Sequence, residues 1–232
     1  MRLAFSTRAV GDVLVVQCAG RIVAGVEVET LHAHLKKSIA EIPDLVLVLD
    51  KIEFVDSSGL GTLVRLVANA RAAGGDIKLC AVPQQVSNTL RITNLNRIFE
   101  IHETEGEAIT ACYQRRTRRE AEFTGLAKEV LCVEESPDLL AYLSELLRRS
   151  GYRVLSGRNL YDARILLRAR KPALVIVGPR LQTADGKCAK EWLAGMDCTM
   201  PLLVLGEDLC ALEAGEAASR LLTQVRALMP DA

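Results

Sequence analysis

Five consecutive apolar residues, Leu45–Leu49, place the strongest constraint on how this chain folds. A run without alternating polar residues is typical of a strand buried on both faces of a parallel sheet. Segments with helical spacing of apolar residues lie on both sides of it, at residues 26–42 and 57–72. The first half therefore predicts a small α/β domain with a mixed sheet and helices packed against it.

The second half repeats the alternation of strand and helix. Apolar strands are expected at residues 130–133, 152–155, 173–177 and 201–205. Helices are expected between them, followed by a final helix at residues 219–229. This order predicts a doubly wound parallel sheet.

An arginine-rich segment separates the two halves. Four of the five residues at positions 115–119 are arginine, and few apolar residues surround them. Such a segment is typical of a solvated helix end that continues into a linker. We therefore predict a first domain at residues 1–113, a linker at 114–127 and a second domain at 128–232.

The overall composition argues against several classes of protein. The 29 basic residues balance the 29 acidic residues, which argues against a dedicated nucleic-acid binder. No apolar run approaches the roughly 20 residues of a membrane helix, so we expect no membrane insertion and a cytoplasmic location. The seven cysteines include no C-x-x-C pair, and the three histidines lack metal-ligand spacing. We therefore expect buried reduced thiols, no metal site and no cofactor.

The segment Asp56–Gly61 is the most informative motif of the first half. It joins the strand at 45–49 to the next helix, through a connector at residues 50–55. Asp56 or Ser57 can cap the helix, and the helix start suits an anion such as phosphate. Gly59 and Gly61 would let a partner surface approach closely. An ordinary capped helix without further function remains an alternative at this point.

Several stretches of the first 113 residues resemble the STAS domain of anti-sigma-factor antagonists. They are Val55–Gly61, Gly74–Cys80, Val13–Val16 with Gly20, and Asn94–Ile101. The resemblance implies that Ser57 is the phosphoacceptor of an anti-sigma kinase and that a serine phosphatase reverses the reaction. It also implies that the unphosphorylated form binds the anti-sigma factor. The chain departs from the family at residues 20–25, where Arg21 lies in a turn that is often acidic.

The second half resembles a response-regulator receiver that has lost its active site. Glu134 and Glu135 stand where that family holds a divalent cation, whereas Gly178 stands where its aspartate is phosphorylated. Gly206 replaces the hydroxyl residue, and the late lysine has no counterpart, which indicates a shortened fifth strand. The acidic pair could hold a cation weakly or simply be solvated. The resemblance implies a pseudo-receiver that serves protein contact, including homodimerisation through residues 200–229.

Together these features predict a bacterial partner-switching regulator that is a kinase substrate and not an enzyme. Its partners would be an anti-sigma factor with serine kinase activity and a serine phosphatase. The predicted contact residues are Asp56, Ser57, Ser58, Gly59 and Gly61, with Ser58 as the next candidate phosphoacceptor. The alternative hypotheses are a constitutive signalling adaptor and a site that binds phosphate or a nucleotide at the Ser57 helix start.

Overall fold

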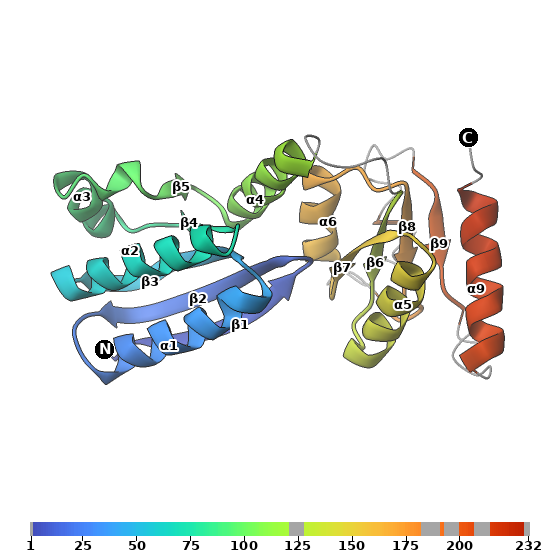
Figure 1. Cartoon of the computed structure of the whole chain (residues 1–232), viewed down its shortest axis with the longest axis horizontal. Coiled ribbons are helices and arrows are strands. Elements are labelled where there is room, and N and C mark those ends of the chain that lie inside the picture. The colour runs from blue at the N-terminus through green and yellow to red at the C-terminus, as the bar shows by residue number, and fades with distance from the viewer. Residues whose placement is uncertain (1, 121–127, 182–190, 193–199, 207–213, 230–232) are drawn as a thin grey trace. The chain divides into compact units, whose positions relative to one another are not determined.

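A computed structural model of the chain describes residues 2–120, 128–181, 191–192, 200–206 and 214–229. The chain divides into two compact units, Met1–Arg119 and Glu120–Ala232 (Figure 1). Among the described residues, no helix combines the length and apolar character needed to cross a membrane. The same residues contain no group of three or more His, Cys, Asp and Glu side chains that could hold a metal ion.

The first unit is built on a five-stranded sheet of order β1-β2-β3-β4-β5. β1 is antiparallel to β2 and all other neighbours are parallel, so the sheet is mixed as predicted. The strands are β1 (Ala4–Val10), β2 (Val13–Ile22), β3 (Asp44–Val55), β4 (Asp76–Cys80) and β5 (Glu100–His102). The helices are α1 (Val26–Glu41), α2 (Ser57–Ala72), α3 (Gln84–Ile92), the short 3-10 helix η1 (Leu95–Arg97) and α4 (Glu105–Glu120).

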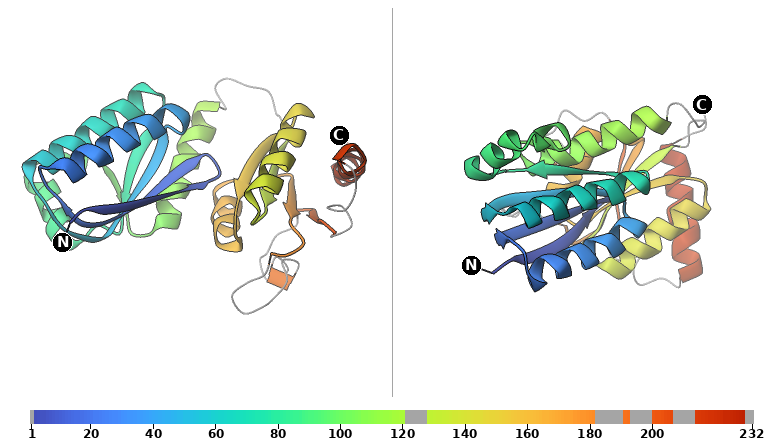
Figure 2. Two further views of the ribbon diagram at one scale, coloured as in Figure 1. Left: turned by 90° about the horizontal axis from the view of Figure 1, so that it is seen from below. Right: turned by 60° about the vertical axis from the view of Figure 1, so that its left-hand side comes forward.

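Helices cover both faces of this sheet because the apolar run of β3 is buried on both sides. Leu45, Leu47 and Leu49 belong to a core that also contains the buried residues of α1, α2 and α3. Helices α1 and α2 lie next to each other over the strands (Figure 2). Val46 and Val48 point to the other face by strand alternation and are buried outside that core, as are four apolar residues of α4.

β3 is longer than the sequence predicted. Residues 50–55, expected as a connector, continue the strand and pair with the second half of β2. Ile52 and Val55 are buried, whereas Lys51, Glu53 and Phe54 are exposed, and a register irregularity between Ile52 and Phe54 interrupts the alternation of a regular strand. β4 pairs only with the first half of β3, up to Val48. The two-stranded extension of β2 and β3 therefore carries the start of α2 at its end.

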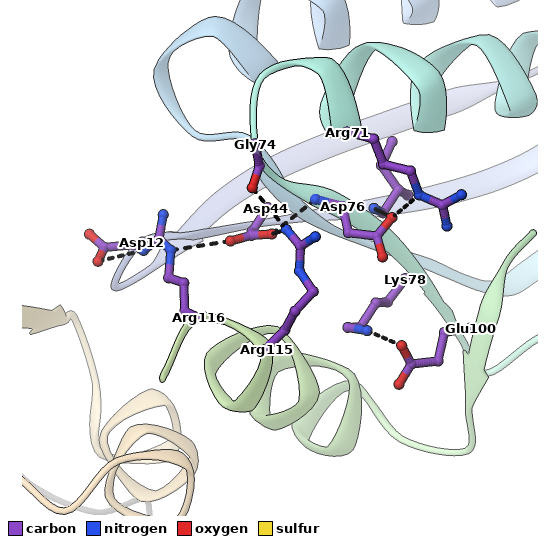
Figure 3. Close-up of polar contacts among 10 residues, drawn as sticks. Asp12, Asp44, Arg71, Gly74, Asp76, Lys78, Glu100, Arg115 and Arg116 are labelled. Carbon is purple, nitrogen blue, oxygen red and sulfur yellow. Dashed lines mark hydrogen bonds and ion pairs between the residues drawn. The ribbon is translucent and has the colours of Figure 1, made fainter. Parts of the chain in front are cut away.

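The predicted linker is also partly wrong, because α4 continues to Glu120. Arg115 and Arg116 are not a solvated end. The Arg115 Nη2 donates to Asp44 Oδ1 at 2.9 Å, and Arg116 contacts Asp12 at 2.8 Å and Asp44 at 3.2 Å (Figure 3). The side chain of Asp44 is only 2% exposed. Its burial explains why two arginines are held there, since an unpaired buried carboxylate is costly.

Tyr113 fixes the same helix to the turn between β1 and β2. Its buried hydroxyl donates to the Val10 carbonyl at 3.1 Å and accepts from the Asp12 N–H at 2.9 Å. In the same sheet, the buried ammonium group of Lys78 in β4 forms an ion pair with Glu100 of β5. The carboxyl-terminal part of α4 is thus anchored by polar contacts around the amino-terminal ends of β2, β3 and β4 (Figure 3).

The second unit has a sheet of four parallel strands in the order β7-β6-β8-β9. This order is compatible with a flavodoxin-like fold. The strands are β6 (Glu129–Val133), β7 (Arg153–Gly157), β8 (Leu174–Val177) and β9 (Leu202–Val204). Its helices include α5 (Pro137–Arg149), α6 (Leu160–Ala169) and α9 (Ala214–Leu228). Most of the helix expected near residue 187 and the segment before α9 lie outside the described residues.

Candidate functional site: the start of helix α2

Asp56 is the cap of α2. Its Oδ1 accepts a hydrogen bond from the Gly59 N–H at 2.7 Å, in the geometry of a side-chain N-cap. Ser57 is then the first residue of the helix. Of the two capping residues that the sequence allowed, Asp56 is therefore the cap and Ser57 is not.

Asp56 also connects this helix to the turn that follows β2. Its Oδ2 accepts from the Ala24 N–H at 3.0 Å, and its own N–H donates to the Ile22 carbonyl at 3.1 Å. The hydrogen bond from Gly59, followed by that from Ala24, lowers the pKa of the Asp56 carboxyl from its usual value of 3.8. Asp56 is thus an ionised cap at neutral pH.

Ser57 and Ser58 are both exposed in the first turn of α2. The hydroxyl of Ser57 therefore stands on the surface, directly after a fixed carboxylate and beside the amino-terminal end of a 16-residue helix. That end carries partial positive charge, which favours an anion attached at this point. The position is suitable for a phosphoryl group in both access and electrostatics.

The two glycines of the motif have different environments. A Cβ on Gly59 would lie 2.1 Å from the carbonyl oxygen of Ile22, whereas a Cβ on Gly61 would meet nothing within 4 Å. Gly59 is buried and allows α2 to pack against the end of β2. Only Gly61 has the open space expected of a residue that a partner surface could approach.

Sequence reasoning missed an exposed aromatic residue beside this motif. Phe54 is 47% exposed, and the guanidinium of Arg21 lies 5.2 Å from the centre of its ring. The pair forms because Arg21 and Phe54 face each other in the β2–β3 register. A lone aromatic residue in a polar stretch was the available signal. It was hidden because residues 50–55 were interpreted as a connector.

The residues that the sequence singled out in the second unit do not form a matched acidic pair. Glu134 is buried, with 7% exposure, whereas Glu135 is exposed. The expectation that both are solvated is therefore wrong for Glu134. Gly178 is buried directly after β8, and Gly206 is exposed shortly after β9.

Residues 4–108 match the family model described as STAS domain. The chain is 37% identical over 65 residues to the Thermotoga neapolitana protein named "Putative anti-sigma factor antagonist TM1081 homolog", covering 28% of this chain and 58% of that protein. It is 33% identical over 66 residues to the anti-sigma F factor antagonist of Paenibacillus polymyxa, covering 28% and 56%. The chain thus spans a little more than half the length of these relatives.

Solved structures of anti-sigma factor antagonists also match about half of the chain. One from Mycobacterium paratuberculosis is 24% identical with a TM-score of 0.44, covering 48% of this chain and 94% of that one. Unphosphorylated SpoIIAA is 21% identical with a TM-score of 0.39, covering 50% and 98%. The family match and the sequence relatives support a STAS domain of the anti-sigma-factor antagonist type at residues 4–108. The family match ends before the second unit.

Proposed function

We propose that the chain is a partner-switching regulator that binds an anti-sigma factor with serine kinase activity. Phosphorylation of Ser57 releases the chain from that anti-sigma factor. The observation that supports this function is the exposed Ser57 hydroxyl at the first residue of α2, directly after the ionised cap Asp56. It lies in a STAS domain whose sequence relatives are named as anti-sigma factor antagonists.

The switch would act through local charge and bulk. A phosphoryl group adds about −1.5 to −2 charges and three acceptor oxygens. The amino-terminal end of α2 tolerates that anion, so the fold of the first unit is expected to persist. A partner docked over Gly61 would instead face a bulky dianion beside the Asp56 carboxylate. Its binding should weaken while the protein stays folded.

In this proposal the chain is a substrate and a binding protein, and not an enzyme. The partner kinase transfers the γ-phosphoryl group of ATP to the Ser57 oxygen, which leaves ADP, and the hydroxyl proton passes to solvent. A serine phosphatase hydrolyses the phosphoester and returns the binding form. Asp56 fixes the helix start and thereby the position of the Ser57 hydroxyl.

Mass spectrometry of the protein from its native cells tests the modification directly. Trypsin would release one peptide, residues 52–65, that contains both serines, and its fragment ions distinguish Ser57 from Ser58. Ser57→Ala should bind the cognate anti-sigma factor constitutively, and Ser57→Glu should bind it more weakly. Ser58→Ala is the matched control and should behave like the wild type.

Equal binding of Ser57→Ala and Ser57→Glu would contradict the assignment of the switch to Ser57. If only Ser58 carried phosphate, the phosphoacceptor would be Ser58. If neither serine carried phosphate and all variants bound one partner equally, the chain would be a constitutive adaptor.

We further propose that the second unit acts through association. Among the described strands, β9 pairs only with β8, and Val204 of β9 is 45% exposed. Edge strands of this kind are normally covered or paired, and symmetric dimers are the commonest oligomers. Light scattering of the full chain should show a dimer, and a monomer at high micromolar concentration would rule out homodimerisation.

A further inference from the structure

The centre of the second sheet is where a ligand would be expected in a fold of this order. Strands β6 and β8 are neighbours, and the chain continues from them to opposite sides of the sheet, to β7 and β9. Open parallel sheets bind their ligands in the crevice at such a switch point, outside the carboxyl ends of the strands. The residues that follow β6 and β8 are Glu134 and Gly178.

The backbone brings these two residues side by side. Val133 and Val177 are register partners, and the Gly178 N–H donates to the Val133 carbonyl at 2.9 Å. The side chain of Glu134 turns into the sheet edge and is 93% buried, since its exposure is 7%. Its Oε1 accepts from the Ser136 N–H at 2.9 Å. Its Oε2 is buried and has no hydrogen-bond partner among the described residues.

The carboxylate of Glu134 lies in the space that a side chain at position 178 would need. A Cβ built on Gly178 would be 1.6 Å from Oε2 and 2.7 Å from Cδ of Glu134. Real Cβ atoms do not approach other heavy atoms so closely, so the carboxylate of Glu134 would have to move. Gly157, at the end of the adjacent strand β7, has ordinary space, because its Cβ would come no nearer than 3.6 Å to any atom.

We infer that the second unit occupies the switch point of its sheet with its own carboxylate, and that a side chain at position 178 would displace Glu134 from it. Burial of the carboxylate is offset by the Ser136 N–H and by the amino-terminal end of the 13-residue helix α5. Glu135 points to solvent and does not share the site. The switch point is therefore occupied by a side chain of the unit itself.

A double-mutant cycle on the full chain tests this mutual exclusion. The only tryptophan, Trp192, belongs to the second unit, so its fluorescence during urea unfolding follows that unit separately. The variants are Gly178→Ala, Glu134→Ala, Glu134→Gln and the two double variants with Gly178→Ala. Gly157→Ala is the matched control glycine, and circular dichroism is the second probe.

Gly178→Ala should lower the urea midpoint by roughly 0.5–1 M, because the displaced carboxylate loses its hydrogen bond from the Ser136 N–H. In the Glu134→Ala background the same change should shift the midpoint by less than about a third of that. Glu134→Gln keeps the shape of the side chain and should retain the full effect. Gly157→Ala should leave the midpoint nearly unchanged.

Equal effects of Gly178→Ala in the wild-type and Glu134→Ala backgrounds would overturn the inference. If Gly178→Ala alone does not fold, the Glu134→Ala/Gly178→Ala variant decides the question. Recovery of a cooperative transition in the double variant supports the inference, and failure to recover contradicts it. No outcome of this cycle depends on phosphorylation of Ser57.

Discussion

Replacing Gly59 by alanine should destabilise the first unit, although alanine is the better helix former. The added Cβ would lie 2.1 Å from the Ile22 carbonyl oxygen and 2.9 Å from the Ile22 Cγ2. The obstacle is backbone that pairs with β3, so the start of α2 must move away from β2. Forcing extra atoms into packed structure costs about 1–3 kcal/mol, whereas a helical Gly→Ala change gains about 0.5–1 kcal/mol.

Gly61→Ala supplies the matched control, because a Cβ there would meet nothing within 4 Å. Both variants share the gain in helix propensity and the smaller entropy of the unfolded chain. Their difference in the free energy of unfolding therefore isolates the steric effect at Gly59, about 1–3 kcal/mol. Gly61→Ala should be slightly more stable than the wild type, and Gly59→Ala should be less stable.

Urea unfolding followed by circular dichroism measures this difference. Trp192 fluorescence provides an internal reference, since it reports the second unit and should not change between the variants. If Gly59→Ala proved as stable as Gly61→Ala, the close packing of α2 against Ile22 would be wrong. The assigned role of Gly59 in the site would then fail with it.

Two further variants probe the contacts around the site and around α4. The pKa of Asp56 is lowered in the folded state by the Gly59 and Ala24 N–H groups, so its contribution to stability is present above the usual value of 3.8 and is lost as the pH falls through the folded value. Asp56→Asn should therefore lose less stability between pH 7 and pH 3 than the wild type, and parallel curves in urea unfolding would contradict this. Tyr113→Phe removes the hydroxyl that bonds the Val10 carbonyl and the Asp12 N–H, and it should lower the free energy of unfolding by about 1–3 kcal/mol. A decrease below about 0.5 kcal/mol would contradict the importance of these two hydrogen bonds.

The spacing of apolar residues along the sequence identified most elements, because apolar residues recur at the positions that an element buries. The run Leu45–Leu49 predicted the central strand, and the spacing of apolar residues predicted α1 and α2 close to their observed bounds. The second half of β3 was missed because most of its residues are exposed and a register irregularity removes a regular alternation. β1 was not predicted for the same reason, since most of its residues are exposed.

Local sequence patterns do not reveal contacts between residues that are far apart in the chain. Nothing near Arg115 and Arg116 shows that they reach Asp44, which lies about 70 residues earlier and is buried. Glu134 illustrates the same limit, because the sequence pattern of a glutamate after a strand is the same whether its side chain is buried or exposed. The absence of a side chain at position 178 was the available signal, and its meaning required the distance between the two residues.

The two polar regions of the first unit lie at opposite ends of β3. Asp44, which holds the end of α4, begins the strand, and Ser57 follows its last residue, Val55, by two positions. The eleven residue steps from Asp44 to Val55, at roughly 3.3 Å each, span about 36 Å along the strand. The screening length at physiological salt is about 8 Å, so the charge of a phosphate on Ser57 does not reach the Asp44 ion pairs. The proposed switch must therefore be sensed by a partner in contact with the surface around Ser57, because its charge cannot act through release of α4.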